Sequence, residues 1–258
     1  MTPIIKANNL CWEINQTKII NDISLTIESG QVLGIIGPNG AGKSSLLKIL
    51  ARINKPQTGK LNLFDKPYTE IDLRSFAKKI AYLEQNAPVN WPILVEKVIE
   101  LGRSPHQKSY AKLNPEDNVA IKKAIEATGI KHLLGRVISS LSQGEKMLVA
   151  LSRIFSLEPK LILADEPTAA LDPYHQLLIM ELLQNHTKTN QDQAAVVVLH
   201  DLSLATRFCD KLLLMHKGKI VSSGTTESVL SDENLREYYK INCYSDFKQG
   251  LIQPLNRI

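Results

Sequence analysis

The sequence lacks the features that mark several classes of protein. Its three cysteines, Cys11, Cys209 and Cys243, are scattered and form no C-x-x-C pair or metal-binding spacing, so we expect free thiols in a reducing cytosol. The first residues contain no apolar signal-peptide core, and the longest apolar runs have strand length, far below the ~20 residues that span a bilayer. We therefore expect a protein that is soluble or that reaches a membrane only through partners.

Aromatic residues are also few, and the charge imbalance is small. Phe, Trp and Tyr make up 5% of the chain, and the net charge of +5 comes without a dense Lys/Arg run. Because nucleic-acid binding needs a basic stripe with aromatic side chains, no nucleic-acid partner is expected. The positive excess suits a protein that handles nucleotides beside an anionic membrane face, and it also suits ordinary solubility, the interpretation we favour.

One stretch, residues 37–44, carries a specific pattern. It has the form G-x-x-x-x-G-K-S, which is typical of a phosphate-binding loop. The apolar run of residues 32–36 precedes it, and leucine and isoleucine follow at helical spacing from Lys43 to Ile53. The loop is therefore predicted to join a buried strand to a helix, which is the setting that the pattern requires.

Each part of this loop has a chemical use. Its glycines let the backbone wrap closely around phosphates, and the N–H groups at the helix N-terminus face an anion. We expect Lys43 to reach the β- and γ-phosphates and the Ser44 hydroxyl to bind Mg²⁺. The alternative is a glycine-rich turn that binds nothing. The predicted nucleotide-binding residues are Gly37, Pro38, Asn39, Gly40, Ala41, Gly42, Lys43, Ser44 and Ser45.

The apolar patterning predicts an α/β protein around this loop. Residues 161–164 and 194–199 are continuous apolar runs, typical of parallel strands buried on both faces. Helices expected at residues 174–185 and 202–208 would complete βαβ units. Residues 212–221 predict a hairpin.

Other parts of the chain predict different local structure. Residues 4–36 are β-rich, and Leu10, Trp12 and Ile14 alternate as if on one strand face. Residues 86–160 predict a helical insertion, in which Asn114 is a helix N-cap followed by proline and acids. From residue 232 onward we expect a short helix and a loop.

Two acids follow the strand at residues 161–164. A carboxylate at the C-terminal end of a strand, in a sheet that also carries a phosphate loop, can hold Mg²⁺, so Asp165 is a candidate metal ligand. Glu166 is placed to polarise an attacking water as general base. The alternative is a strand that is simply capped by polar residues.

A second pattern, Ser142-x-x-Glu145, precedes an apolar run at helical spacing. It predicts a capping box at the start of a helix. It also suits a helix N-terminus aimed at a phosphate, and the residues alone do not choose between these interpretations.

Taken in order, these motifs resemble those of the nucleotide-binding subunit of an ABC transporter, over about residues 4 to 240. They are residues 37–44 for Walker A, Gln85 for the Q-loop glutamine, residues 141–145 for the signature, residues 161–165 for Walker B with Glu166 as the catalytic glutamate, residues 170–172 for the D-loop and His200 for the switch histidine.

The resemblance implies a role for each motif. Two copies would pair head to tail, with ATP between Walker A of one copy and the signature of the other. The implied residues are Lys43, Glu166 and His200 for catalysis, Ser44, Gln85 and Asp165 for Mg²⁺, and Ser142, Gln143 and Gly144 for contact across the interface. Judged without the family, a histidine at a strand end, such as His200, is more often structural.

The sequence departs from the family pattern at several positions. Gln143 stands where the signature has its usual second glycine, and Lys146–Met147 replace the commoner Gln/Arg pair. The position of the adenine-stacking aromatic falls on Ile14, while Trp12 lies two residues earlier. Trp12 either packs in the core or contacts the base.

The resemblance implies a P-loop NTPase of α/β class with a RecA-like core, an N-terminal antiparallel β subdomain and an inserted helical subdomain. We expect an ABC ATPase domain at residues 4–240, with the helical subdomain near residues 87–158, and a C-terminal tail at residues 241–258. The loop after Gln85, residues 86–92, is expected to face a permease, with Trp91 either an exposed anchor or a core residue.

Within the family, the chain resembles ATPases that import iron(III)-siderophores, haem or cobalamin. This likeness rests on residues 100–106 and 114–117, and on residues 200–205 running into 208–210. It implies hydrolysis of ATP with Mg²⁺, a homodimer, two transmembrane permease subunits, an indirect periplasmic binding protein, and a peripheral place on the cytoplasmic side of a bacterial inner membrane. The alternatives are an ATPase of another metal importer or an exporter, or a soluble ABC ATPase that acts on nucleic acid or ribosomes.

Overall fold

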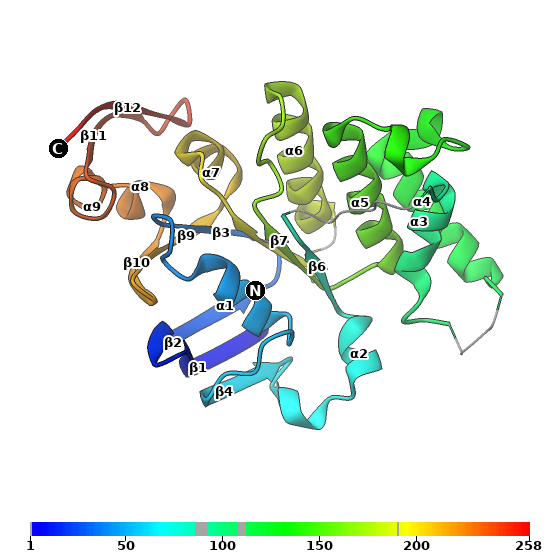
Figure 1. The fold of residues 1–258 in the computed structure, drawn as a ribbon, viewed down its shortest axis with the longest axis horizontal. Helices are drawn as coiled ribbons and strands as arrows, with labels where there is room; N and C mark the ends of the chain where they lie inside the picture. The colour runs from blue at the N-terminus through cyan, green and yellow to red at the C-terminus, as the bar shows by residue number, and fades with distance from the viewer. Residues whose placement is uncertain (1, 86–91, 108–111, 190) are drawn as a thin grey trace.

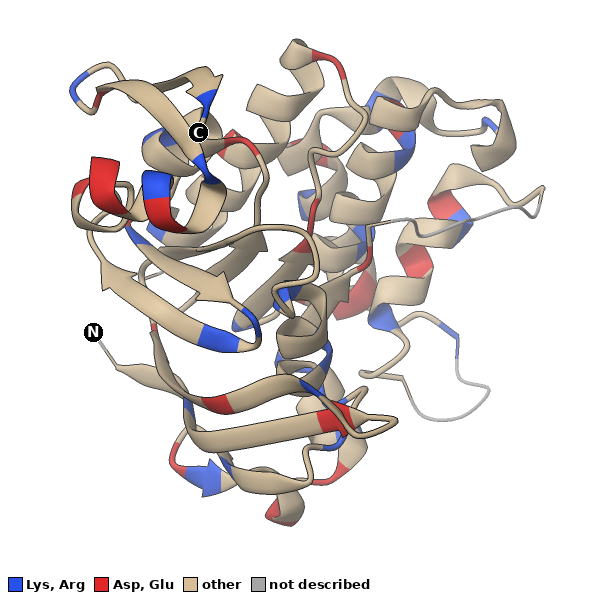
Figure 2. Ribbon diagram, turned by 60° about the vertical axis from the view of Figure 1, so that its left-hand side comes forward, with Lys and Arg blue, Asp and Glu red and all other residues tan. Residues whose placement is uncertain are grey.

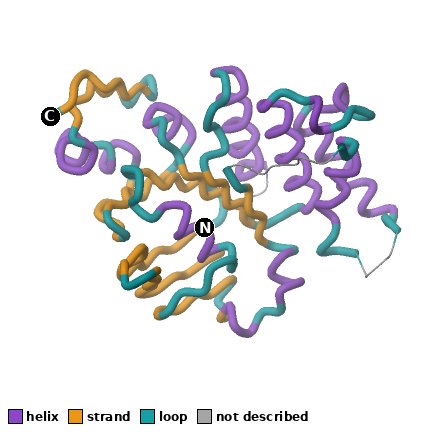
Figure 3. Tube along the Cα trace, viewed as in Figure 1, coloured by secondary structure: helices purple, strands orange, loops and turns teal. Residues whose placement is uncertain are grey.

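The structure is a computed structural model, and it describes residues 2–85, 92–107, 112–189 and 191–258. A mixed central sheet runs through the molecule (Figure 1), with an antiparallel sheet beneath it and a group of helices at one end. Figure 3 shows the strands gathered in the centre and on one side, and most helices on the other. This is the predicted fold class.

The central sheet has the order β10-β9-β3-β8-β7-β6. Its strands are β3 (Val32–Ile36), β6 (Ile80–Leu83), β7 (Leu161–Asp165), β8 (Ala194–Val198), β9 (Lys211–His216) and β10 (Lys219–Gly224). Every residue of β3, β7 and β8 is buried, as expected of parallel strands covered on both faces. β9 and β10 form the predicted hairpin, whose turn has positive φ at Lys217 and Gly218.

Two apolar cores cover the two faces of this sheet. Alternate residues of β3 point to opposite cores, with Val32 and Ile36 in one and Leu33 and Ile35 in the other. The first core also contains residues of α5 (Gln143–Leu157), α6 (Pro173–Thr189) and α7 (Leu202–Phe208). The second contains α1 (Lys43–Leu50) and the antiparallel sheet. α1 ends before Ile53, which is 56% exposed rather than on the predicted helix face.

The antiparallel sheet has the order β2-β1-β4-β5. It consists of β1 (Pro3–Ile14), β2 (Thr17–Glu28), β4 (Thr58–Leu63) and β5 (Lys66–Pro67), followed by η1 (Tyr68–Glu70) and α2 (Leu73–Ala77). The predicted alternation in β1 is wrong at its end, since Leu10 is buried but Ile14 is 48% exposed. Register shifts on both sides of Trp12 are the reason, because each shift changes which side chains face the core.

The middle of the chain forms the group of helices. These are α3 (Val95–Glu100), η2 (Leu101–Arg103), α4 (Pro115–Thr128), η3 (Ile130–Leu133), η4 (Ile138–Ser140) and α5. Asn114 caps α4 as predicted, and it exchanges hydrogen bonds with Asp117 in a capping box. Residues 86–91 of the expected permease-facing loop, including Trp91, lie outside the described residues.

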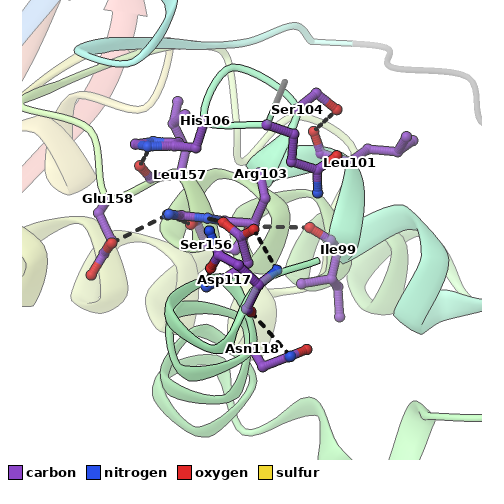
Figure 4. A network of polar contacts seen from close by, with 12 residues as sticks. Ile99, Leu101, Arg103, Ser104, His106, Asp117, Asn118, Ser156, Leu157 and Glu158 are labelled. Atoms are coloured by element: carbon purple, nitrogen blue, oxygen red, sulfur yellow. Dashed lines mark hydrogen bonds and ion pairs between the residues drawn. The ribbon is translucent and has the colours of Figure 1, made fainter. Parts of the chain in front are cut away.

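A buried polar network ties these helices together (Figure 4). Arg103 is 4% exposed, and its Nε donates to Asp117 Oδ1 at 2.8 Å. Its Nη1 donates to the Ser156 carbonyl at 2.7 Å and to Glu158 Oε2 at 3.2 Å. Asp117 Oδ2 also accepts from the Asn114 amide at 3.1 Å. The same carboxylate therefore closes the α4 capping box and neutralises the buried guanidinium.

The C-terminal residues are more ordered than the expected helix and loop. After α8 (Thr226–Val229) come α9 (Asp232–Asn234), the π-helix η5 (Leu235–Tyr239) and an antiparallel hairpin of β11 (Ile241–Asp246) and β12 (Leu251–Arg257). The hairpin packs on α7 through Ile252, which is 4% exposed. The expectation of a loop was wrong because β12 shows no alternation, so its docking to α7 leaves no pattern in the sequence.

Basic and acidic residues are interspersed over the elements seen in Figure 2. Within the described ranges, no helix combines the length and apolar character that crossing a bilayer requires.

Candidate nucleotide-binding site

The phosphate loop lies between β3 and α1, as predicted, and neighbouring backbone holds it closely. A Cβ on Gly37 would lie 2.2 Å from the Met215 carbonyl, and one on Gly42 would lie 2.7 Å from the Ile19 carbonyl. Both glycines also have positive φ, 147° and 98°. The Gly218 amide donates to the Ala41 carbonyl at 3.0 Å, so the β9–β10 turn supports the loop.

A cavity of about 380 Å³ opens over the loop. Seven of the predicted nucleotide-binding residues line it together with two residues from other elements; the lining is Ile19, Asn39, Gly40, Ala41, Gly42, Lys43, Ser44, Ser45 and Glu166. The cavity therefore joins the loop to the predicted general base. A concave site with backbone N–H groups and one lysine suits a phosphate chain.

Lys43 is the cation of this site. Its side chain is buried, and its Nζ donates to the carbonyls of Gly37 at 2.8 Å and Pro38 at 3.1 Å. Burial lowers the pKa of Lys43, and the nearby Glu166 and Asp165 carboxylates oppose this effect. An anion that enters the cavity would offer this ammonium group a stronger partner than two carbonyls.

Asp165 ends β7 and meets the phosphate loop across the sheet. Its Oδ1 accepts a hydrogen bond from Ser44 Oγ at 2.9 Å, and its Oδ2 accepts one from the Tyr82 hydroxyl at 3.1 Å. Burial raises the pKa of Asp165, the two hydroxyls lower it, and the charge of Glu166 raises it further. The net shift is upward, because the loss of hydration on burial outweighs what the two hydroxyl donors supply to the ionised form.

Glu166 forms hydrogen bonds with two of the other predicted residues. Gln85 Nε2 donates to Glu166 Oε2, and His200 Nε2 bonds to Glu166 Oε1. The structure therefore brings together, from three separate motifs, the predicted general base, a residue expected to bind Mg²⁺ and the histidine expected to take part in catalysis. Glu166 itself has φ of 50°, which turns the chain sharply away from β7.

The donor set at the edge of the sheet fits Mg²⁺. This ion prefers hard oxygen ligands and is usually held by one or two protein oxygens together with waters and substrate phosphates. Ser44 Oγ and Asp165 Oδ1 are such oxygens, and they lie 2.9 Å apart at the mouth of the phosphate loop. Burial raises the pKa of Asp165, and a bound cation would favour the ionised form of this carboxylate.

The predicted signature residues lie elsewhere, at the start of α5. Ser142 caps the helix, its Oγ accepting from the Glu145 amide at 3.2 Å, while Glu145 Oε2 accepts from the Ser142 amide at 2.7 Å. Gln143 is exposed and Gly144 is buried. Among the described residues that line the cavity, none comes from this helix start, so one copy does not bring the two motifs together.

The D-loop packs against that helix start. His175 Nδ1 bonds to Asp172 Oδ2 at 2.6 Å, and a Cβ on Gly144 would lie 2.4 Å from the His175 ring. Position 144 therefore has no room for a side chain, independently of any role that Gly144 has in binding. This contact links the D-loop and the signature within one subunit.

Two residues of the site were missed from the sequence. Tyr82 lies on β6, beside β7, and its hydroxyl holds Asp165. Ile19 lines the cavity from β2. The strand position of Tyr82 in front of Gln85 was the available signal, whereas nothing in the pattern distinguishes Ile19. Of the two candidates for the base contact, Trp12 packs partly against the second core and Ile14 is exposed.

Comparisons of the sequence and of the structure with known proteins both find ABC transporter proteins. The family model described as ABC transporter matches residues 20–169. The cobalamin import ATP-binding protein BtuD of Halobacterium salinarum is 33% identical over 232 residues, which is 90% of this chain. The chain spans 58% of the length of that relative.

Solved structures share the fold over most or nearly all of this chain. An inward-facing metal-chelate type ABC transporter superposes with a TM-score of 0.85 at 26% identity, over 99% of this chain and 98% of that chain. The dimeric structure of MJ0796, a bacterial ABC transporter cassette, superposes with a TM-score of 0.74 at 25% identity, over 86% of this chain and 99% of that chain.

Proposed function

This chain belongs to the ABC transporter family, and on that premise we propose that it is the subunit that hydrolyses ATP to drive an importer of metal chelates. The observation that carries the proposal is the meeting of the phosphate loop with Glu166 around one cavity. A loop alone would support nucleotide binding, whereas a loop with an acid held by two further polar side chains supports hydrolysis.

Binding begins at the phosphate loop. The N–H groups at the start of α1 face the phosphates, and Lys43 exchanges the Gly37 and Pro38 carbonyls for phosphate oxygens. Ser44 and Asp165 would hold Mg²⁺, which supplies charge neutralisation between the phosphates when it is bound. Tyr82 keeps the Asp165 carboxylate in place through its hydroxyl.

Hydrolysis then depends on Glu166. Its carboxylate accepts a proton from the attacking water, while Gln85 and His200, which contact its two oxygens, orient it and border the place of the γ-phosphate. Lys43 and His200 carry the positive potential that the developing negative charge requires. The product is ADP and phosphate.

Two copies are needed to complete the site in this proposal. The start of α5, with Ser142, Gln143 and Gly144, does not line the cavity of its own subunit and is free to face the cavity of a second. The likeness to the dimeric MJ0796 cassette supports a homodimer. The transport partners are a permease with two membrane subunits, on whose cytoplasmic side this protein binds, and, indirectly, a substrate-binding protein.

The proposed cargo is a metal chelate of the class of iron(III)-siderophore, haem or cobalamin. It rests on the cobalamin import protein and the metal-chelate type transporter among the similar proteins. It rests also on the sequence likeness in residues 100–106, 114–117, 200–205 and 208–210. In cells that carry Glu166→Gln, uptake of one of these chelates should be lost while growth on excess free iron continues. Normal uptake of all three would refute the cargo and leave the ATPase proposal intact.

Glu166→Gln tests the catalytic proposal directly. The substitution keeps the size of the side chain and removes its basicity, so ATP hydrolysis should fall about 10²-fold or more while ATP binding persists. Steady-state phosphate release and nucleotide titration measure the two effects, and size-exclusion chromatography with ATP should show a trapped dimer.

Glu181→Gln is the matched control, since Glu181 is exposed on α6 and away from the cavity. It should hydrolyse ATP at the wild-type rate. Near wild-type hydrolysis by Glu166→Gln would show that another group is the base.

A further inference from the structure

His175 contacts two motifs of the nucleotide site, although it belongs to neither. It is the third residue of α6, and its Nδ1 donates to Asp172 Oδ2 at 2.6 Å, since an ionised carboxylate can only accept. Asp172 Oδ1 in turn accepts a hydrogen bond from the His175 amide at 3.1 Å. Two hydrogen bonds therefore fix His175 to the last residue of the D-loop.

The D-loop side of this contact is itself held in place. Gln176, the next residue of α6, donates through its Nε2 to the carbonyls of Thr168 at 3.3 Å and Leu171 at 3.1 Å. These hydrogen bonds tie the chain that runs from Glu166 to α6 back onto the helix. The His175 ring therefore projects from a fixed support that begins at the predicted general base.

The signature side of the contact depends on the His175 ring. Gly144 has no side chain, and the ring occupies the space that a Cβ would fill, since Cδ2, Cγ and Nε2 would lie 2.4, 2.5 and 2.6 Å from that atom. Gly144 is buried, and the His175 side chain is only 20% exposed. Because glycine has more backbone freedom than other residues, the ring restricts Gly144 where the residue cannot restrict itself.

The position of Gly144 matters because of what the start of α5 offers. The first amides of a helix have no acceptor within the helix, and the Ser142 cap takes the amide of Glu145. The amides of Gln143 and Gly144 therefore remain available to an acceptor from outside the helix, and a helix N-terminus favours an anion. Groups that bind a ligand must be held to within about 0.5 Å of the productive geometry.

We propose that His175 is a positioning residue for the signature: it holds the Gly144 amide where a phosphate bound to a second copy can accept its hydrogen bond. The inference rests on the proposed function, because it requires that the signature of one copy lies over the nucleotide of the other. It also connects the two sites of such a dimer, since Glu166 serves the nucleotide of its own copy and Gly144 serves that of the other.

Two substitutions separate the two contacts of His175. His175→Asn keeps a donor on the γ-carbon, which can reach Asp172, and removes most of the ring that packs on Gly144. His175→Phe keeps a ring beside Gly144 and loses the hydrogen bond that orients it. The ring is the part that contacts the signature, so His175→Asn should have the larger effect and His175→Phe should retain part of the wild-type behaviour.

The expected defect is confined to the steps that need a second copy. Each variant is combined with Glu166→Gln, the parent protein in which hydrolysis is blocked, and the ATP-dependent monomer–dimer constant is measured by analytical ultracentrifugation. His175→Asn should weaken that constant by about ten- to hundredfold, because the dimer contains the contact twice. Its affinity for ADP with Mg²⁺, measured by calorimetry, should stay within about twofold of the parent, because one copy binds ADP through its own phosphate loop.

His132→Asn is the matched control. His132 is exposed on η3, and its Nδ1 bonds to the Gly129 carbonyl at 3.2 Å, three residues earlier in the chain. In the same parent, this variant should change neither dimerisation nor affinity for ADP.

Dimerisation of the His175→Asn variant at the strength of the parent would overturn the inference and leave the proposed function intact. A loss of ADP affinity as large as the loss of dimerisation would overturn it as well, because His175 would then support the fold as a whole. A larger defect in His175→Phe than in His175→Asn would contradict the role of the ring. If the parent itself forms no dimer with ATP, the proposed two-copy site falls, and this inference with it.

Discussion

Two regions of the molecule contain buried charged side chains. In one region hydrogen bonds outweigh the effect of burial on the pKa, and in the other burial outweighs the interactions that oppose it. In the helical region, the Arg103 guanidinium has three acceptors and Asp117 has two donors (Figure 4). Burial opposes ionisation of Asp117, but its hydrogen bonds outweigh burial and lower its pKa. In the nucleotide site, burial prevails: the pKa of Asp165 is raised and that of Lys43 is lowered.

The difference distinguishes buried charges that stabilise the fold from buried charges that are available to a ligand. The Arg103 network is complete within the chain, so it stabilises the packing of α4 against α5 and offers nothing to a ligand. The nucleotide site keeps charge that the chain compensates only in part, which lowers stability and leaves interactions for phosphate and a cation. Lys43, which lines the cavity, and Asp165, which bonds to Ser44 in its lining, therefore have pKa values shifted in opposite directions, and such shifts cluster at functional sites.

The largest expected effect comes from breaking the complete network. Asp117→Asn removes the buried negative charge beside Arg103 and leaves the exposed Glu158 as the remaining carboxylate that pairs with it, so the free energy of unfolding should fall by about 3–5 kcal/mol. Chemical denaturation measures it. As the control, Lys97→Ala removes an exposed ion pair of α3 and should change stability within experimental error. A loss as small as that of the control would show that the network is not structural.

A smaller effect of opposite sign is expected in the nucleotide site. Asp165→Asn removes an uncompensated buried charge, so without nucleotide the free energy of unfolding should rise by roughly 1 kcal/mol. Binding of ADP with Mg²⁺ should weaken in the same variant, because a ligand oxygen of the cation is lost. If Asp165→Asn is instead less stable than wild type, the two regions do not differ as described.

The smallest effect, a dependence of stability on pH, should distinguish the regions within one protein. The raised folded pKa of Asp165 means that the folded state binds its proton more tightly, so Asp165 should add stability as pH falls through that pKa toward 3.8. The lowered folded pKa of Asp117 means that its contribution is present above 3.8 and is lost as pH falls through the folded value.

Melting curves between about pH 3 and 7 for the wild type, Asp165→Asn and Asp117→Asn measure both contributions. Asp165→Asn should lack the rise in stability that occurs above pH 3.8, and Asp117→Asn should lack the loss that occurs below it. The same pH profile for all three proteins would contradict both assignments.

Much of the fold and the chemistry could be predicted because both leave local patterns. β3 was predicted to the residue, since a strand buried on both faces must be apolar throughout. The capping box at Ser142 was also predicted, because its partners lie three residues apart.

What could not be predicted depends on pairings between distant residues. Arg103 lies in a stretch that the sequence marked only as a family likeness, and Asp117 lies in the predicted start of a helix. Their ion pair becomes visible only when the fold brings η2 and α4 together. The contact of Tyr82 with Asp165 requires the strand order, and the register shifts around Trp12 require the sheet.

The position of β3 has a consequence for how the protein is made. β3 leads into the phosphate loop, yet its partners β8 and β9 belong to residues 194–198 and 211–216. Ribosomes add about 5–20 residues per second, so the roughly 160 residues between β3 and β8 take about 8–30 s to appear. Throughout that interval an entirely apolar strand has no sheet to join, and the nascent chain is exposed to aggregation until its last third has emerged.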